Sequence, residues 1–163
     1  MGENQGVDRS FKGKRRIFKG VQRYPAGVEK VFPLLCPVRE AEYLPQWRCK
    51  LIYLASGTIE EGGVFETDLV SEGFERDIWV VSSLIPNRSI QFVRVSRKRA
   101  MTYNIRVAKM SEPGTVLEWT QVVTGLNPKR NEYVHRLVQS DFTVLLKKME
   151  DLLKAYLNTL EQA

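Results

Sequence analysis

The strongest constraint on this chain is an amphipathic pattern that fills its C-terminal end. The pattern begins at Asn127-Pro128, where the asparagine can cap a helix and the proline suits its first position. Apolar side chains then recur in a band about 100° wide. They are Val134, Val138, Phe142, Leu145, Met149, Leu152, Leu153, Tyr156 and Leu160. We therefore expect one helix of about 30 residues, roughly 45 Å long, whose apolar face needs a partner.

Upstream of this helix the hydrophobic period changes to two, which is typical of strands. Turn signals such as Gly62-Gly63, Pro86-Asn87 and Pro113-Gly114 divide the region after Trp47 into six segments. A further segment before Pro25 alternates less regularly and suits a first strand. The seven predicted strands are 16–24, 47–55, 64–72, 75–85, 88–96, 101–110 and 115–126.

Three prolines organise the chain between the first two strands. We expect a helix over 28–35 that Pro33 interrupts, and a second one that begins at Pro37 and ends before Pro45. Cys36 and Cys49 border this region. Their apolar neighbours favour buried free thiols, although Cys36 at a helix N-terminus could instead be a reactive thiolate.

This order of elements predicts an α+β protein in which the long helix packs on one face of a seven-stranded antiparallel sheet. A sheet of this size curls, and a single helix does not fill its concave side. A cavity is therefore expected.

Three stretches carry a resemblance to a known family: YPAGVEKVFPLLC after the first strand, Trp47 at the start of the second, and LEWTQVVTGLN before the last helix. With them the chain resembles the START-like superfamily (SRPBCC), which has the helix-grip fold, over about residues 14 to 160. Members include polyketide cyclases and dehydratases, plant allergens and lipid-transfer domains. The likeness is greatest to bacterial single-domain proteins without an assigned activity. It implies one ligand-binding domain over 14–163, behind a flexible basic tail at 1–13.

The resemblance also implies that inward-facing residues line a cavity between the sheet and the long helix. Strand alternation and the helical band assign the residues expected to contact a ligand. They are Tyr53, Phe65, Thr67, Trp79, Phe92, Tyr103, Trp119, Gln121, Asn131, His135, Val138 and Phe142. A largely aromatic lining with few polar groups suits an apolar ligand, although the same residues could form a solid core.

Two of these residues are candidates for proton transfer. His135 is the single histidine, at the edge of the apolar band, and Tyr103 is expected nearby. Arg94 has inward parity and could hold an acidic ligand group, or could lie on the surface at its strand end. Glu66 and Asp68 are expected on the solvated face.

The sequence offers little for metal or cofactor chemistry. One histidine and two cysteines 13 residues apart do not supply a zinc site, and the glycines fit neither GxGxxG nor P-loop spacing. We expect no metal and no cofactor.

Size and charge bound the remaining possibilities. The 163 residues suit one domain, and no apolar run approaches a bilayer span, so a cytoplasmic protein is expected, monomeric or dimeric. The net charge of +6 is unevenly distributed, with an acidic block at 60–77 and a basic one at 78–111. Adjacent strands of opposite charge give cross-strand ion pairs, and no nucleic-acid module is recognised, so no nucleic acid is expected as a partner.

Three functions follow from these features. The leading hypothesis is binding or transport of a hydrophobic small molecule, lipid-like or polyketide-like. The second is a cyclase-like or dehydratase-like enzyme that uses His135 or Tyr103. The third, weaker hypothesis is an interaction module with a basic surface.

Overall fold

The computed structural model describes residues 6–68, 75–108 and 113–163. It has the predicted α+β helix-grip fold, in which seven antiparallel strands form one sheet in the order β1-β7-β6-β5-β4-β3-β2. The strands are β1 (Arg15–Tyr24), β2 (Cys49–Tyr53), β3 (Val64–Asp68), β4 (Arg76–Ile85), β5 (Ser89–Val95), β6 (Arg99–Val107) and β7 (Thr115–Gly125). The predicted ends of the third and sixth strands, at 69–72 and 109–110, lie outside the described residues.

The first strand lies beside the last, so the two ends of the chain meet at one edge of the sheet. β1 pairs with β7 from Arg15↔Thr124 to Tyr24↔Thr115, and β2 forms the opposite edge. Alternate residues of the central strands are buried on the inner face, as their period of two predicts. This face carries the core and the cavity described below.

Two short helical turns cross one end of the sheet, where the three prolines predicted them. The first is α1 (Val28–Val31), which continues as the 3-10 helix η1 (Phe32–Leu35) from the position of Pro33. The second, α2 (Pro37–Glu40), begins at its proline but is shorter than expected. Beyond it the chain continues in turns, in which Leu44 N–H donates to the carbonyl of Glu40 at 2.8 Å.

The predicted long C-terminal helix is present, but it begins later than expected, because an extended segment separates α3 (Pro128–Arg136) from α4 (Gln139–Gln162). Leu137 and Val138 have extended backbone, with ψ of 138° and 152°. A tertiary contact holds the new helix start in place. The Gln139 side chain donates to the carbonyl of Lys19 at 2.8 Å and accepts from its N–H at 3.3 Å. α4 therefore begins where its first residue meets the edge strand β1.

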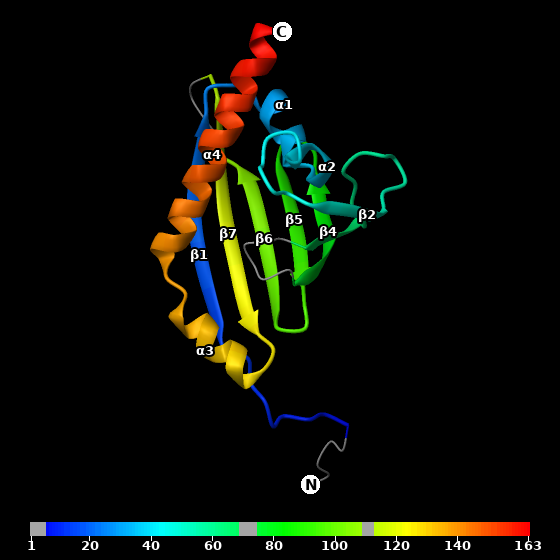
Figure 1. The fold of residues 1–163 in the computed structure, drawn as a ribbon, viewed down its shortest axis with the longest axis vertical. Coiled ribbons are helices and arrows are strands. Elements are labelled where there is room, and N and C mark those ends of the chain that lie inside the picture. Colours follow the sequence, from blue (N-terminus) through cyan, green and yellow to red (C-terminus); the bar gives the residue numbers. More distant parts are fainter. Residues whose placement is uncertain (1–5, 69–74, 109–112) are drawn as a thin grey trace.

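α4 runs along β1 rather than over the middle of the sheet (Figure 1). A glycine permits this close approach, since a Cβ on Gly20 would lie 2.4 Å from Cδ1 of Leu146. The Phe18 and Phe142 rings meet next to it, with centroids 6.1 Å apart. Because the helix lies near one edge, it leaves much of the inner face of the sheet uncovered.

A buried polar bridge ties the helix to two strands. Gln22, only 1% exposed, donates from Nε2 to the carbonyl of Leu146 at 2.9 Å. Its Oε1 accepts from the indole Nε1 of Trp119 at 2.8 Å. One side chain thus joins β1, β7 and α4.

Among the described residues, no helix is both long and apolar enough to cross a membrane.

We predict that Gln22→Leu lowers the free energy of unfolding by about 1–3 kcal/mol, because the buried indole N–H of Trp119 loses its acceptor. Chemical denaturation measures this loss. The control is Gln91→Leu on the exposed outer side of β5, which should change stability by less than about 0.5 kcal/mol. Equal effects of the two substitutions would contradict the role of the bridge.

Candidate ligand-binding cavity

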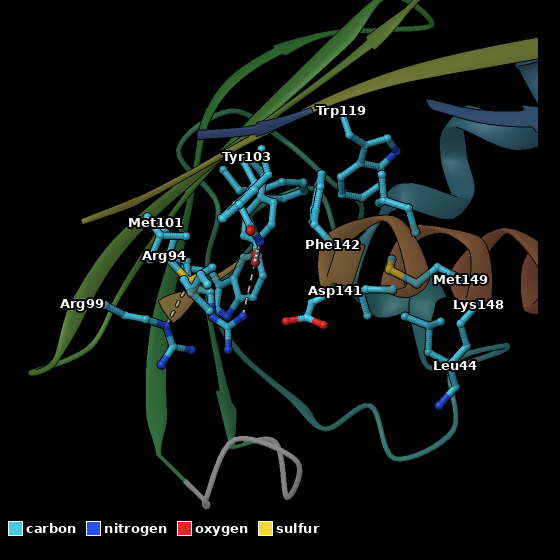
Figure 2. Close-up of a pocket in the computed structure, with 18 of the residues that line it drawn as sticks. Leu44, Arg94, Arg99, Met101, Tyr103, Trp119, Asp141, Phe142, Lys148 and Met149 are labelled. Carbon is cyan, nitrogen blue, oxygen red and sulfur yellow. Dashed lines mark hydrogen bonds between the residues drawn. The ribbon is translucent and has the colours of Figure 1, made fainter. Parts of the chain in front are cut away.

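A cavity of about 690 Å³ lies between the inner face of the sheet, the region of α2 and the loop after it, and helices α3 and α4. Figure 2 shows its two sides, with Phe142 and Met149 projecting from α4 and Tyr103 and Arg94 from the sheet. The volume falls within the range of about 300–1,000 Å³ that is usual for small-molecule sites.

Eight of the twelve residues predicted to contact a ligand line this cavity. They are Phe65, Trp79, Phe92, Tyr103, Trp119, Gln121, Val138 and Phe142. Strand alternation placed the sheet residues of this set on the inner face, which is the buried one. Their contact with a ligand stays a prediction.

Two sheet residues predicted to contact a ligand lie outside the cavity lining. Tyr53 is 59% exposed on the edge strand β2, whose register against β3 shifts between Leu51 and Tyr53. Leu51 is 46% and Ile52 51% exposed, so this edge strand buries neither face and its alternation does not select an inner one. Thr67 faces inward but is covered, since its Oγ1 accepts a hydrogen bond from Trp79 Nε1 at 2.8 Å.

Two residues of α3 also lie elsewhere. The Asn131 side chain accepts from Lys14 N–H at 2.7 Å and donates to the carbonyl of Lys12 at 3.0 Å, so it holds the chain before β1. His135 is exposed, and its carbonyl accepts from Arg16. The break after α3 interrupts the helical band that predicted an inward position for His135. Of the two candidates for proton transfer, Tyr103 is the one that lines the cavity.

An aromatic wall forms the sheet side of the cavity. Trp79 stacks between Tyr103 and Phe65, with ring centroids 5.5 Å and 5.3 Å away. Phe92 and Trp47 meet the same indole edge-on, at 5.9 Å and 6.0 Å. The register explains the cluster, because Phe65 pairs with Trp79 across β3 and β4. These rings present a broad apolar surface with π faces.

The hydroxyl of Tyr103 is the polar centre of this wall. Its oxygen accepts from Gln121 Nε2 at 3.0 Å and from Arg94 Nη1 at 3.4 Å. Gln121 is the cross-strand neighbour of Tyr103 on β7. No described residue accepts the hydroxyl proton, which leaves it able to donate to a ligand.

A cluster of ion pairs closes the cavity beside Tyr103. Arg94, 3% exposed, donates from Nε to Asp77 Oδ2 at 2.9 Å and lies 4.7 Å above the Trp79 ring. Arg99 reaches the same oxygen at 3.4 Å and Glu75 at 3.6 Å. These are the cross-strand pairs predicted from the acidic and basic blocks. Arg94 is therefore buried and does not lie on the surface, and its partner is a carboxylate of the protein.

Sequence reasoning did not single out Asp77, Arg99 and Met101, although all three are buried around the polar end of the cavity. Asp77 has the same parity as Trp79 on β4, and that signal could have found it. A charged residue with inward parity is ambiguous, however, until its partner on another strand is known. Asp77 Oδ1 has no hydrogen-bond partner among the described residues.

Glu40 is an acid that sequence reasoning also overlooked. It ends α2, is half-buried and lines the cavity. Burial raises the pKa of its carboxyl to about 8 from an ordinary value of 4.5. A carboxyl with such a pKa is largely protonated at neutral pH.

Both cysteines are free, and Cys36 is buried. Burial is the main cause that raises the pKa of the Cys49 thiol to about 11, which disfavours its thiolate. Among residues 6–68, 75–108 and 113–163, no group of three or more His, Cys, Asp or Glu side chains is arranged to hold a metal ion.

We predict that Asp77→Asn destabilises the fold by about 3–5 kcal/mol, because two buried guanidinium groups lose a negative partner. The matched control is Glu118→Gln, which removes an exposed ion pair with Arg106 and should cost at most about 1 kcal/mol. Thermal or chemical unfolding compares the two variants. A loss for Asp77→Asn no larger than that of the control would contradict the structural role of the cluster.

A second prediction concerns pH. Between about pH 5 and pH 8 the folded protein retains a proton on Glu40 that the unfolded chain has released, so raising the pH destabilises the fold. Glu40→Gln should therefore gain stability relative to wild type as the pH rises through this range. The difference for Glu42→Gln should stay flat, since the bond from Arg39 lowers the pKa of Glu42. A flat difference for Glu40→Gln would contradict the raised pKa.

No model of a protein family matches the sequence, and no curated protein sequence does. Truncated norcoclaurine synthase from Thalictrum flavum is similar in structure, with a TM-score of 0.67 and 12% identity over 92% of this chain and 98% of that one. For Ara h 8.0201 the TM-score is 0.65, with 10% identity over 90% and 99% of the chains. For CalU16 from Micromonospora echinospora it is 0.56, with 16% identity over 90% and 86%. At these identities the likeness is one of fold, and the fold is the helix-grip fold.

Proposed function

We propose that this protein binds a hydrophobic small molecule, lipid-like or polyketide-like, inside the cavity between the sheet and α4. The observation that carries the proposal is an aromatic wall around one hydroxyl, that of Tyr103, whose proton no described residue accepts. Apolar walls with a few convergent polar groups are typical of ligand sites. The structural similarity to helix-grip proteins supports a ligand-binding fold.

The hydrogen-bond donor on the aromatic wall indicates which polar group the ligand carries. The Tyr103 hydroxyl receives hydrogen bonds from Arg94 and Gln121, which polarise it as a donor. Its natural partner is a carbonyl or hydroxyl oxygen. The ligand is thus an apolar molecule, with an oxygen acceptor directed at Tyr103 and its body against Trp79 and Phe92.

The proposal is tested first by native mass spectrometry of freshly purified protein, in search of a co-purifying small molecule. A panel of fatty acids, sterols and aromatic polyketides should then raise the melting temperature. Ligand at about 100 times its Kd stabilises by about 2.7 kcal/mol. No bound molecule and no shift across the panel would reject the proposal.

We predict that Tyr103→Phe weakens binding of an oxygen-bearing ligand from this panel about fivefold, because one hydrogen bond of about 1 kcal/mol is lost. Tyr53→Phe removes an exposed hydroxyl outside the cavity and should leave the Kd unchanged. Isothermal titration calorimetry measures both. Equal Kd values for wild type and Tyr103→Phe would refute the assigned contact.

A cyclase-like or dehydratase-like enzyme is the second candidate. The observation in its favour is the same phenol, since a hydroxyl beside a guanidinium can transfer a proton to a folded substrate. His135 has no part in this version, because it lies outside the cavity lining. Turnover that survives in Tyr103→Phe would exclude this mechanism.

A further inference from the structure

Glu40 lines the cavity from the end of α2. Trp47 lines the same cavity, and its indole donates from Nε1 to the carbonyl of Pro37 at 2.9 Å. This bond holds the Trp47 ring beside α2, the helix that Glu40 ends. Leu44 and Pro45 complete the apolar surroundings. The carboxyl therefore lies in an environment in which a charge needs a partner.

Two other acids at the cavity already have partners. Asp77 binds Arg94 and Arg99, and Glu75 lies within 3.6 Å of Arg99. Among the described residues, no hydrogen-bond donor or cation engages the Glu40 carboxyl. An unsatisfied acid at the wall of a cavity is therefore available to a ligand.

We propose that Glu40 forms a second polar subsite, which binds a basic nitrogen of the ligand as an ion pair. The inference rests on the proposed function and adds the chemistry of the other end of the ligand. Tyr103 already offers a donor to an oxygen acceptor, whereas an ionised Glu40 offers an acceptor to a donor. A protonated amine satisfies the carboxylate with charge-assisted hydrogen bonds, which are strong where water is excluded. The Trp47 ring adds a π surface for the cation.

Other charged groups line the cavity and contribute to its field. They are Glu75, which directly precedes β4, Arg94 from β5, Arg99 from β6, Arg130 from α3, and Asp141 and Lys148 from α4. The titratable neighbours of Glu40 itself are Tyr43 and the thiol of Cys49. Figure 2 shows the carboxylate of Asp141 directed into the space between α4 and the sheet. Asp141 is exposed, so water screens its charge more than that of Glu40.

Three probes of one shape separate the possibilities: 4-phenylbutylamine, 4-phenylbutan-1-ol and 4-phenylbutyrate. Calorimetry at neutral pH measures each against the full-length protein, Glu40→Gln and Asp141→Asn. We expect the amine to bind wild type at least about tenfold more tightly than the alcohol. Glu40→Gln should abolish this preference for the amine and leave the Kd of the alcohol unchanged. The unchanged Kd of the alcohol also shows that the variant is folded. Asp141→Asn should retain the preference.

The pH dependence gives a second readout. The amine should bind more tightly as the pH rises from about 6 to 8, because Glu40 with its raised pKa must ionise, and Glu40→Gln should lose this dependence. If the alcohol binds but the amine is not preferred, or if Asp141→Asn loses as much as Glu40→Gln, the subsite is refuted while the proposed function stands. If none of the three probes binds, the subsite is refuted, and the outcome for the proposed function depends on the separate panel of fatty acids, sterols and polyketides.

Discussion

The architecture depends on how closely helix α4 approaches strand β1. Gly20 presents no Cβ to Leu146, and Gln22 joins the carbonyl of the same leucine to the indole of Trp119. Overpacking at such a contact and loss of such a bridge both cost stability, so the position of the helix is closely determined. With the helix held near one edge, the inner faces of the central strands are left to form a cavity wall. The cavity thus follows from a packing contact at its border, since Leu146 and Trp119 also line it.

The cavity contains two kinds of polar group, and the difference between them carries its chemistry. Arg94 and Asp77 form an ion pair at close range and are part of the scaffold. Tyr103 and Glu40 are different. No described residue accepts the hydroxyl proton of Tyr103, and no described residue donates a hydrogen bond to the carboxyl of Glu40. Polar groups in apolar walls are costly unless they find partners. A ligand that supplies both partners would be selected by chemistry as well as by shape.

Periodicity in the sequence predicted most of the fold, because each element follows a local rule. Strand alternation assigned the inner face of the sheet, and the prolines marked the ends of the short helices. The break at Leu137 and Val138 could not be predicted in this way. The apolar band of the sequence continues across these two residues, whereas the first residue of α4, Gln139, bonds to Lys19, 120 residues away.

The limits of prediction for the cavity have similar causes. Tyr53 lies on an edge strand that buries neither face, and the break after α3 interrupts the helical band to which His135 was assigned. Arg94 was ambiguous because its partner Asp77 lies on a neighbouring strand, 17 residues earlier. Glu40 was overlooked because its surroundings come from α2 and from the loop after it, and their contacts depend on the tertiary structure. For Arg94 the missing information was a contact with another strand, and for Glu40 it was the way in which the turns after α2 fold around it.

One further consequence comes from the aromatic wall. The chain has three tryptophans, and all three, Trp47, Trp79 and Trp119, line the cavity. An indole emits light whose wavelength and intensity depend on the polarity of its surroundings. A molecule that displaces water from this space would change the environment of every tryptophan in the protein at once. The protein therefore has a built-in optical reporter of its own occupancy, with no background from indoles elsewhere in the chain.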